Sequence, residues 1–239
     1  MRLRRIFKWL VMVAMSAMVC TGFTVAREGY EMYREALSTV SLSDKVAEIQ
    51  AVEGYTELDA LPETYLDAVV SVEDHRFYSH IGIDFIAIGR AIVNDIRAGR
   101  FVEGGSTITQ QLAKNLYFTQ EKKMERKIAE VFLAFDLEEN YSKDEILELY
   151  VNSIYFGDGY DNVGQASIGY FDKKPAEMTE YESTLLAGIP NAPSKYAPTK
   201  NPELARQRQK QVLRRMEACG CFTQEEAETV AAQMIAMAP

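Results

Sequence analysis

Residues 124–139 constrain the fold of this chain more than any other segment. Apolar side chains occupy both sides of a helix drawn over them: Ile128, Val131, Phe132 and Phe135 on one side, and Leu133, Ala134 and Leu137 on the other. A helix that is apolar nearly all round is stable only inside a protein. Other elements must therefore surround this segment.

Helix signals also dominate the rest of the chain after residue 63. Ser142 with Glu145, Thr179 with Glu182 and Thr223 with Glu226 each match a capping box, and Asn201 before Pro202 is typical of a helix start. Strand-like alternation is scarce and no internal repeat is visible. We therefore predict a mainly α fold.

The N-terminus predicts a membrane anchor. Four basic residues, Arg2, Arg4, Arg5 and Lys8, precede an uncharged and mostly apolar stretch over residues 9–26. With the two apolar residues before Lys8, this stretch approaches the roughly 20 residues that cross a bilayer, and the bases predict a cytoplasmic N-terminus. The alternative is a signal peptide cleaved after Ala26. In either case the rest of the chain lies on the extracytoplasmic side, and the uncleaved form is a single-pass protein of the cell membrane.

The chain divides into three predicted parts. Residues 1–26 form a cytoplasmic tip and transmembrane anchor, the polar residues 27–60 form a stalk, and residues 61–239 form one domain, as the length allows. The sequence has 26 Lys and Arg against 35 Asp and Glu, a net charge of −9, and four of the bases precede the anchor. The exported part is therefore strongly acidic, which argues against nucleic acid as a partner.

Glu73 is predicted to be a buried acid. Leu66, Val69 and Val70 follow one face of a helix, and Glu73 continues that face at i+7. Loss of water raises the pKa of a carboxyl group toward neutrality, which suits a general base or acid. The alternative is a helix end at which Glu73 and Asp74 reach solvent.

Residues 104–115, GGSTITQQLAKN, predict a binding site for an oxygen-rich, anionic ligand, with phosphate or sugar as the first candidates. The glycine pair lets the backbone approach a ligand. Hydroxyl, amide and ammonium donors follow it closely: Ser106, Thr107, Thr109, Gln110, Gln111 and Lys114. The alternative is a turn followed by a helix that Ser106 or Thr107 caps.

Three further segments are interpreted from their patterns. Arg126 and Lys127 precede Glu130 at i+4 and i+3 spacing, which predicts a salt bridge or a functional charged cluster. Residues 143–152, KDEILELYVN, are interpreted as scaffold. Residues 83–102 are apolar but contain three arginines, which fits a helix in the membrane interface or a core helix.

Four blocks in this order closely resemble the peptidoglycan glycosyltransferases, the family that polymerises lipid II into glycan strands. They are EDHRFYSHIG at 73–82, GGSTITQQLAKN at 104–115, RKIAE at 126–130 and KDEILELYVN at 143–152. The likeness runs from about residue 63 to residue 215. The sequence has no Ser-x-x-Lys or Lys-Thr-Gly motif of penicillin-binding transpeptidase modules, so the resemblance is to the monofunctional branch.

The resemblance implies a fold and a reaction. The fold is a lysozyme-like helical lobe with a small membrane-associated jaw at about residues 83–102, preceded by one transmembrane helix. Glu73 and Glu130 are the catalytic acids, and Glu73 deprotonates the 4-hydroxyl of lipid II. This oxygen displaces undecaprenyl pyrophosphate from the lipid-linked strand with inversion, while Lys114 and Arg126 lie near pyrophosphate.

The resemblance also implies the remaining site residues and partners. The substrate-binding set is Asp74, Phe77, His80, Gly104, Ser106, Thr107, Gln110, Gln111, Lys114, Asn115, Arg126 and Lys127. Seen alone, Phe77 and His80 are typical packing residues. The partners are lipid II, the lipid-linked glycan strand, the bilayer and other cell wall synthesis proteins. No cofactor is required and no metal site is expected, although Mg²⁺ or Mn²⁺ assists some family members.

Two other functions compete with polymerisation. A lysozyme-like lytic muramidase would use one glutamate to cleave glycan strands, but the Lys and Arg set has no role in breaking a sugar–sugar bond. A catalytically silent envelope-binding or scaffold module would retain the motifs without turnover.

Overall fold

The structure is a computed structural model that describes residues 2–100, 104–119 and 123–236. Over these residues it contains helices and turns but no strand, with one isolated bridge between Gly157 and Tyr160. The predicted mainly α class is confirmed. Residue 1 of the predicted tip, residues 101 and 102 of the predicted jaw, and residues 237–239 of the predicted domain lie outside the described residues.

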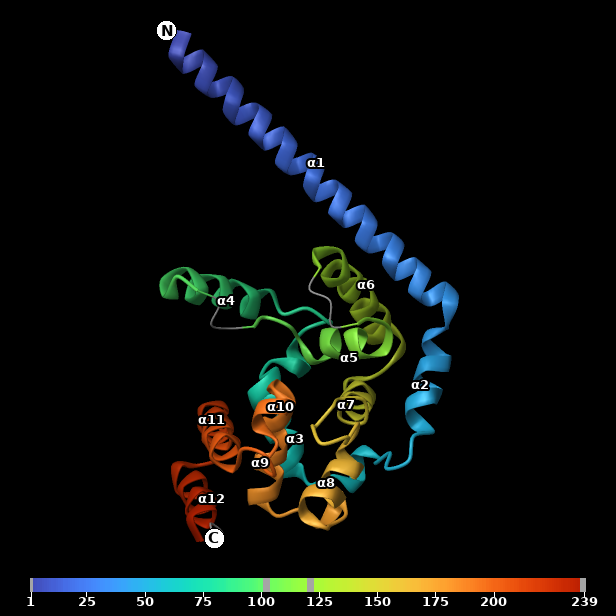
Figure 1. The fold of residues 1–239 in the computed structure, drawn as a ribbon, viewed down its shortest axis with the longest axis vertical. Helices are drawn as coiled ribbons and strands as arrows, with labels where there is room; N and C mark the ends of the chain where they lie inside the picture. The colour runs from blue at the N-terminus through green and yellow to red at the C-terminus, as the bar shows by residue number, and fades with distance from the viewer. Residues whose placement is uncertain (1, 101–103, 120–122, 237–239) are drawn as a thin grey trace.

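The helices follow one another with short connections (Figure 1). Their bounds are α1 Arg2–Thr39, α2 Leu42–Gln50, α3 Glu63–Glu73, α4 Phe85–Ala98, α5 Ile108–Tyr117, α6 Met124–Asn140, α7 Lys143–Val151, α8 Val163–Phe171, α9 Glu180–Gly188, α10 Pro193–Tyr196, α11 Pro202–Cys219 and α12 Gln224–Ala236. Four 3₁₀ turns are also present: η1 Leu58–Ala60, η2 Phe77–Ser79, η3 Pro175–Glu177 and η4 Ile189–Asn191.

The structure confirms the helix starts predicted from the sequence, with one difference in the capping of α11. The capping boxes of Ser142 and Thr179 are formed, and Thr223 exchanges the same pair of hydrogen bonds with Glu226. Asn201 precedes α11 as expected, but its side chain makes no capping hydrogen bond. Its backbone (φ −138°, ψ 69°) departs from the extended conformation of the capping residues Ser142 and Thr179.

Helix α6 is covered on two sides, as its composition predicts. Leu133 and Leu137 are buried in the main core, which also contains Leu112 of α5. On the opposite side α1 packs along α6, where the rings of Tyr30 and Tyr33 lie 5.2 and 5.5 Å from that of Phe132. Helices α5 and α1 therefore cover two sides of α6. The burial predicted for residues 124–139 is incomplete, since Phe135 is 39% exposed and Met124 is 67% exposed.

Close approach between α1 and α6 depends on a glycine. A Cβ added to Gly29 would lie 2.7 Å from both the carbonyl oxygen of Glu125 and Cβ of Ile128. Nearby, the hydroxyl of Tyr33 donates a 2.7 Å hydrogen bond to Asp136. Residues 27–39, which the sequence predicted as part of a stalk, therefore continue helix α1 and pack against α6.

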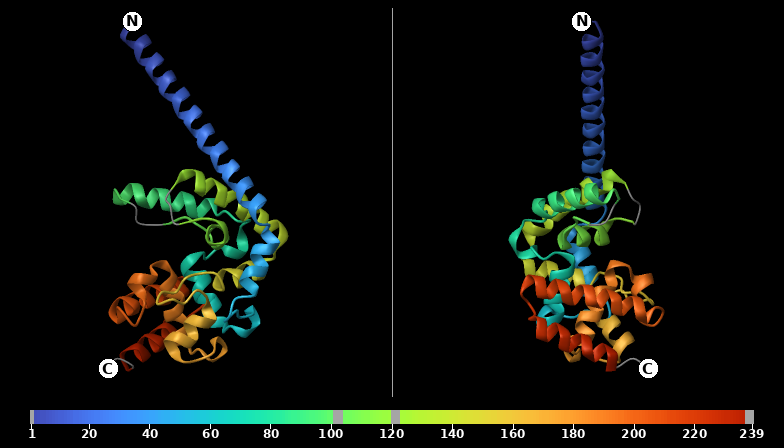
Figure 2. Two further views of the ribbon diagram at one scale, coloured as in Figure 1. Left: turned by 45° about the vertical axis from the view of Figure 1, so that its right-hand side comes forward. Right: turned by 90° about the vertical axis from the view of Figure 1, so that its left-hand side faces the viewer.

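Helix α1 extends well beyond the lobe (Figures 1 and 2). Among the described residues it is the one helix long and apolar enough to cross a membrane, over Phe7–Thr39. Its apolar side chains there, including Trp9, Val13 and Phe23, are exposed in the structure.

Helix α4 projects from the lobe at the end from which α1 leaves (Figure 2). Only Ala91 of this helix is buried, and large apolar side chains are exposed along it: Phe85, Ile86, Ile92, Val93 and Ile96. The core-helix interpretation of this segment is therefore wrong, because none of the described residues covers these apolar side chains. An amphipathic helix with exposed apolar and basic residues fits the interfacial interpretation.

Residues 143–152 are scaffold, as interpreted from the sequence. In α7 the side chains of Ile146, Leu147 and Tyr150 are fully buried. Asn152, just after the helix, accepts from the backbone N–H of Thr56 and donates to its carbonyl oxygen at 2.9 and 2.8 Å. This block therefore fixes the segment before α3, and α3 ends at Glu73.

Candidate active site

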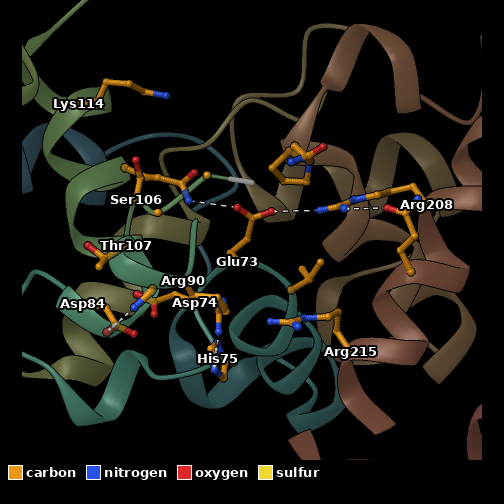
Figure 3. Close-up of a pocket in the computed structure, with 18 of the residues that line it drawn as sticks. Glu73, Asp74, His75, Asp84, Arg90, Ser106, Thr107, Lys114, Arg208 and Arg215 are labelled. Carbon is orange, nitrogen blue, oxygen red and sulfur yellow. Dashed lines mark hydrogen bonds and ion pairs between the residues drawn. The ribbon is translucent and has the colours of Figure 1, made fainter. Parts of the chain in front are cut away.

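A cleft of about 620 Å³ lies between the α5 side of the lobe and α11 (Figure 3). The end of α3 forms its floor, the loop before α5 forms one wall, and η4 with α11 forms the other. The predicted site residues that line it are Glu73, Asp74, Gly104, Ser106, Thr107, Gln111 and Lys114. Two sequence blocks about thirty residues apart therefore meet at one cavity.

Glu73 is the last residue of α3, and its side chain is 10% exposed. Its Oε2 accepts a 3.0 Å hydrogen bond from Nε2 of Gln111, whose Oε1 accepts from the hydroxyl of Tyr150 at 3.3 Å. Its Oε1 lies 3.6 Å from Nη2 of Arg208 and has no hydrogen bond among the described residues. The solvent-facing alternative is therefore wrong, although Glu73 does end the helix.

Burial raises the pKa of Glu73 above that of an ordinary glutamate. The hydrogen bond from Gln111 and the charge of Arg208 act in the opposite direction but do not cancel the effect of burial. This direction is the one expected from the sequence. A carboxyl group that lines the cleft and has one oxygen without a hydrogen bond can accept a proton from a bound hydroxyl group.

Asp74 fixes the chain immediately after Glu73. Its Oδ2 accepts from the backbone N–H of Ile108, in the first turn of α5, and lies 2.9 Å from Nε2 of His80. A carboxylate at a helix N-terminus is favoured by the unpaired N–H groups there. Asp74 thereby holds Glu73, α5 and the loop that follows α3 in one arrangement.

We expect Asp74→Ala to lower the free energy of unfolding by about 2–4 kcal/mol, because Ile108 N–H and His80 lose a charged, buried partner. Chemical denaturation followed by circular dichroism measures this change. Asp161→Ala, at an exposed aspartate, is the matched control and should change stability little. Equal stability of the two variants would contradict this role of Asp74.

Phe77 and His80 lie in the fold beneath the cleft and do not line it. Phe77 is fully buried, and Nζ of Lys143 lies 4.4 Å from its ring centroid. His80 is held by Asp74. The packing interpretation of these two residues fits the structure, and any effect on the reaction passes through Asp74 and the loop.

The loop before α5 serves the fold and the cleft together. Thr107 caps α5 and forms a capping box with Gln110, and its hydroxyl donates to the carbonyl oxygen of Gly82 at 2.6 Å. This confirms the capping interpretation for Thr107. The side chain of Gln110 is buried and completes the capping box. Gly105 packs on α4, since an added Cβ would lie 3.2 Å from Cα of Ile88.

Glu130 lies with its two cations on α6, as the spacing predicts. Its carboxylate is 2% exposed, with Nε of Arg126 at 2.9 Å and Nζ of Lys127 at 2.8 Å. Lys127 also donates to Oγ of Ser106 at 2.7 Å. This cluster adjoins the cleft through Ser106 but is not part of its lining.

Lys114 connects the α6 cluster to the cleft. Burial lowers the pKa of its ammonium group, Glu130 raises it, and Arg126 and Lys127 lower it. Among the described residues Lys114 has no salt bridge within 4.0 Å, and it lines the cleft. Asn115 is exposed, donates to the carbonyl oxygen of Ser153 at 3.3 Å and lies outside the cleft lining.

The opposite wall contains residues that the sequence did not single out. Helix α11 contributes Arg208, Gln211, Arg214 and Arg215, and His75 and Arg90 lie nearby. Residues 208, 211 and 215 lie on one helix face at i, i+3 and i+7 spacing, and this spacing could have indicated a wall of the cleft. A basic helix face exposed to solvent has the same spacing, so the pattern alone does not distinguish the two. Figure 3 shows Lys114 on one side of Glu73, and Arg208 and Arg215 on the other.

A buried carboxyl group that lines a cleft with cations on both sides is typical of acid–base sites for anionic ligands. The chain belongs to the transglycosylase family, whose model, described as Transglycosylase, matches residues 42–217.

Curated relatives of the chain are penicillin-binding proteins. Penicillin-binding protein 1A of Aquifex aeolicus (strain VF5) is 48% identical over 174 residues, which are 73% of this chain and 24% of that protein. Penicillin-binding protein 1F of Bacillus subtilis (strain 168) is 45% identical over 172 residues, 72% of this chain and 24% of that protein. The chain spans about a quarter of the length of these curated relatives.

A solved structure, Penicillin-Binding Protein 1A from Haemophilus influenzae, matches with a TM-score of 0.44 and 21% sequence identity. The match covers 74% of this chain and 17% of that chain.

Proposed function

We propose that this protein is a peptidoglycan glycosyltransferase that polymerises lipid II into β-1,4-linked glycan strands. The observation that carries the proposal is the position of Glu73, a buried carboxyl group with one oxygen that has no hydrogen bond, in a cleft with cations on both walls. Membership of the transglycosylase family supports the same reaction.

In the proposed reaction, Glu73 accepts the proton of the acceptor's 4-hydroxyl. The freed oxygen forms a bond to the anomeric carbon of the lipid-linked strand, and the bond from this carbon to the diphosphate breaks. One displacement inverts the anomeric centre and needs no covalent sugar–enzyme intermediate. Undecaprenyl pyrophosphate leaves with the bonding electron pair.

The leaving diphosphate gains negative charge as the bond breaks, so fixed cations lower the barrier. We assign this role to Lys114, which lines the cleft, together with Arg126. Glu130 holds Arg126 and Lys127, and Lys127 holds Ser106, so the second acid acts in this proposal by keeping the cationic wall in place. Gln111 holds Glu73, and Gly104 and Ser106 are at the substrate surface of the loop.

Polymerisation of purified lipid II by the full chain in detergent tests the proposal. The expected product is a long glycan that lysozyme digests to small fragments. Release of soluble fragments from cell wall sacculi, without polymer from lipid II, would instead support the lytic alternative. We do not favour that alternative, because hydrolysis between sugars expels no diphosphate for the cations to stabilise.

We further propose that α1 anchors the protein in the cell membrane by a single pass and that the lobe is extracytoplasmic, with α4 in contact with the bilayer. The lipid tails of both substrates would then stay in the membrane while their diphosphates reach the cleft. The 239 residues contain no serine acylation motif, so our proposal for them includes glycosyl transfer and not transpeptidation. Other cell wall synthesis proteins remain proposed partners.

The raised pKa of Glu73 predicts the pH dependence of polymerisation. A base must be ionised, so the rate should rise with pH through the pKa of Glu73, above the value of about 4.3 of a free glutamate. Arg208 lowers this pKa, so Arg208→Gln should move the acidic limb of the kcat/KM profile to higher pH. An acidic limb that is unchanged in Arg208→Gln would contradict this contact.

A further inference from the structure

The α11 wall carries one neutral amide among its arginines. Gln211 lies one helical turn after Arg208, and both line the cleft. Nη1 of Arg208 donates to Oε1 of Gln211 at 3.1 Å, while Nη2 of the same guanidinium lies 3.6 Å from Oε1 of Glu73. The guanidinium group of Arg208 therefore lies between the amide of Gln211 and the carboxyl group of Glu73, the proposed base.

Hydrogen-bonding chemistry fixes the orientation of the amide. An arginine side chain has donors and no acceptor, so the atom of Gln211 that faces Arg208 must be the oxygen. The NH₂ group of Gln211 has no hydrogen bond to any of the described residues. The NH₂ group of Gln211 can therefore donate hydrogen bonds to an oxygen atom of a bound ligand.

The proposed reaction places the acceptor sugar beside this donor. In that reaction the 4-hydroxyl of the acceptor approaches the carboxyl group of Glu73, which lines the cleft beside Arg208. On a pyranose ring the 4-hydroxyl has two nearest oxygen neighbours, the hydroxyl on C3 and the hydroxyl on C6. These two exocyclic hydroxyl groups are the sugar oxygens that we expect to lie nearest to a donor beside Arg208.

Resting on the proposed function, we infer that Gln211 is a specificity residue that donates a hydrogen bond to the C3 or the C6 hydroxyl of the acceptor sugar. This bond would turn the 4-hydroxyl toward Glu73. A site built to bond a hydroxyl discriminates against an analogue that lacks it, since the donor is then left unpaired. Correct orientation of the reacting oxygen contributes to kcat as well as to binding.

The test uses the full chain in detergent with a preformed lipid-linked tetrasaccharide as donor. Three acceptors are compared: lipid II, and lipid II analogues without the 3-hydroxyl or the 6-hydroxyl of the terminal sugar. With one of the two analogues the wild type should lose about 3–10-fold in kcat/KM, the value of one hydrogen bond. Gln211→Ala should lose the same factor with lipid II and nothing further with that analogue.

Gln211→Glu separates contact with the sugar from support of Arg208. A glutamate oxygen still accepts from Arg208 but has no NH₂ group, so we expect the same loss as in Gln211→Ala, measured on the pH plateau of each variant. Gln207→Ala is the matched control, because Gln207 is exposed on the same helix and is not part of the cleft lining. It should keep the rate and the discrimination of the wild type.

Two results would overturn the inference. One is wild-type discrimination in Gln211→Glu, which would show that no donation from residue 211 is needed. The other is an equal loss with all three acceptors in Gln211→Ala, which would make Gln211 a support for Arg208 alone. A wild-type enzyme that makes no polymer from lipid II would instead refute the proposed function, which is a separate outcome.

Discussion

Glu73→Gln should lower the rate of lipid II polymerisation by at least about a hundredfold, the smaller limit of what general acid–base catalysis contributes. The substitution keeps the shape of the side chain and its place at the end of α3. It removes the oxygen that would accept the proton of the incoming hydroxyl, since an amide is a very weak base. Product formation over time on a gel or by chromatography measures the loss.

Stability provides the internal control for this variant. The pKa of Glu73 is raised in the folded protein, so the folded state binds this proton more tightly than the unfolded state. The free energy of unfolding therefore falls as the pH rises from the pKa of a free glutamate to the pKa of Glu73 in the folded protein. Above this range Glu73 is a buried carboxylate, and it destabilises the folded state. Glu73→Gln removes the penalty, so its melting temperature at neutral pH should equal or exceed that of the wild type.

The matched variant is Glu63→Gln, at the exposed first residue of the same helix. It should polymerise lipid II at the wild-type rate. Near-normal turnover in a folded Glu73→Gln protein would remove the basis of the proposed mechanism. Among the described residues that line the cleft, no other carboxyl group has a buried oxygen without a hydrogen bond.

Lys114→Met should lower kcat by about 10²–10³-fold, as does the removal of one donor that stabilises developing charge. Methionine retains much of the length of the side chain and removes its charge. Because the diphosphate gains charge only as the glycosidic bond breaks, kcat should fall more than the affinity for lipid II. Steady-state kinetics over a range of lipid II concentrations separates the two effects.

Lys210→Met is the control for the loss of one positive charge, since Lys210 is exposed on α11 and does not line this cleft. Its kcat should stay close to that of the wild type. A Lys114→Met enzyme with an unchanged kcat and a raised KM would mean that Lys114 binds the ground state of the substrate, not the departing diphosphate.

The sequence was most informative where a local physical rule acts. Capping boxes such as Ser142 with Glu145 predicted the starts of helices, and the all-round apolar character of residues 124–139 predicted a buried helix. The period of α3 predicted that Glu73 faces away from water. Each of these features depends on residues within a few positions of one another.

Long-range contacts could not be predicted in the same way. Nothing in the spacing of Arg208 within α11 indicates that it meets Glu73, which precedes it by 135 positions, because this contact depends on how α11 packs against α3. The family resemblance placed Thr107 and Gln110 at the substrate, whereas in the structure their polar groups also close the first turn of α5. A residue type that suits both a ligand and a helix cap is assigned only by three-dimensional contacts.

The unbroken course of α1 has a consequence for how substrate is found. Its 38 residues extend about 57 Å at 1.5 Å per residue, nearly twice the thickness of about 30 Å of a hydrocarbon layer. With its outer end packed against α6, the protein would keep its reaction centre at a constant height over the lipid headgroups. Encounter with an isoprenoid-bound sugar then becomes a two-dimensional search by lateral diffusion, whose rate depends on the surface density of the lipid and not on its bulk concentration.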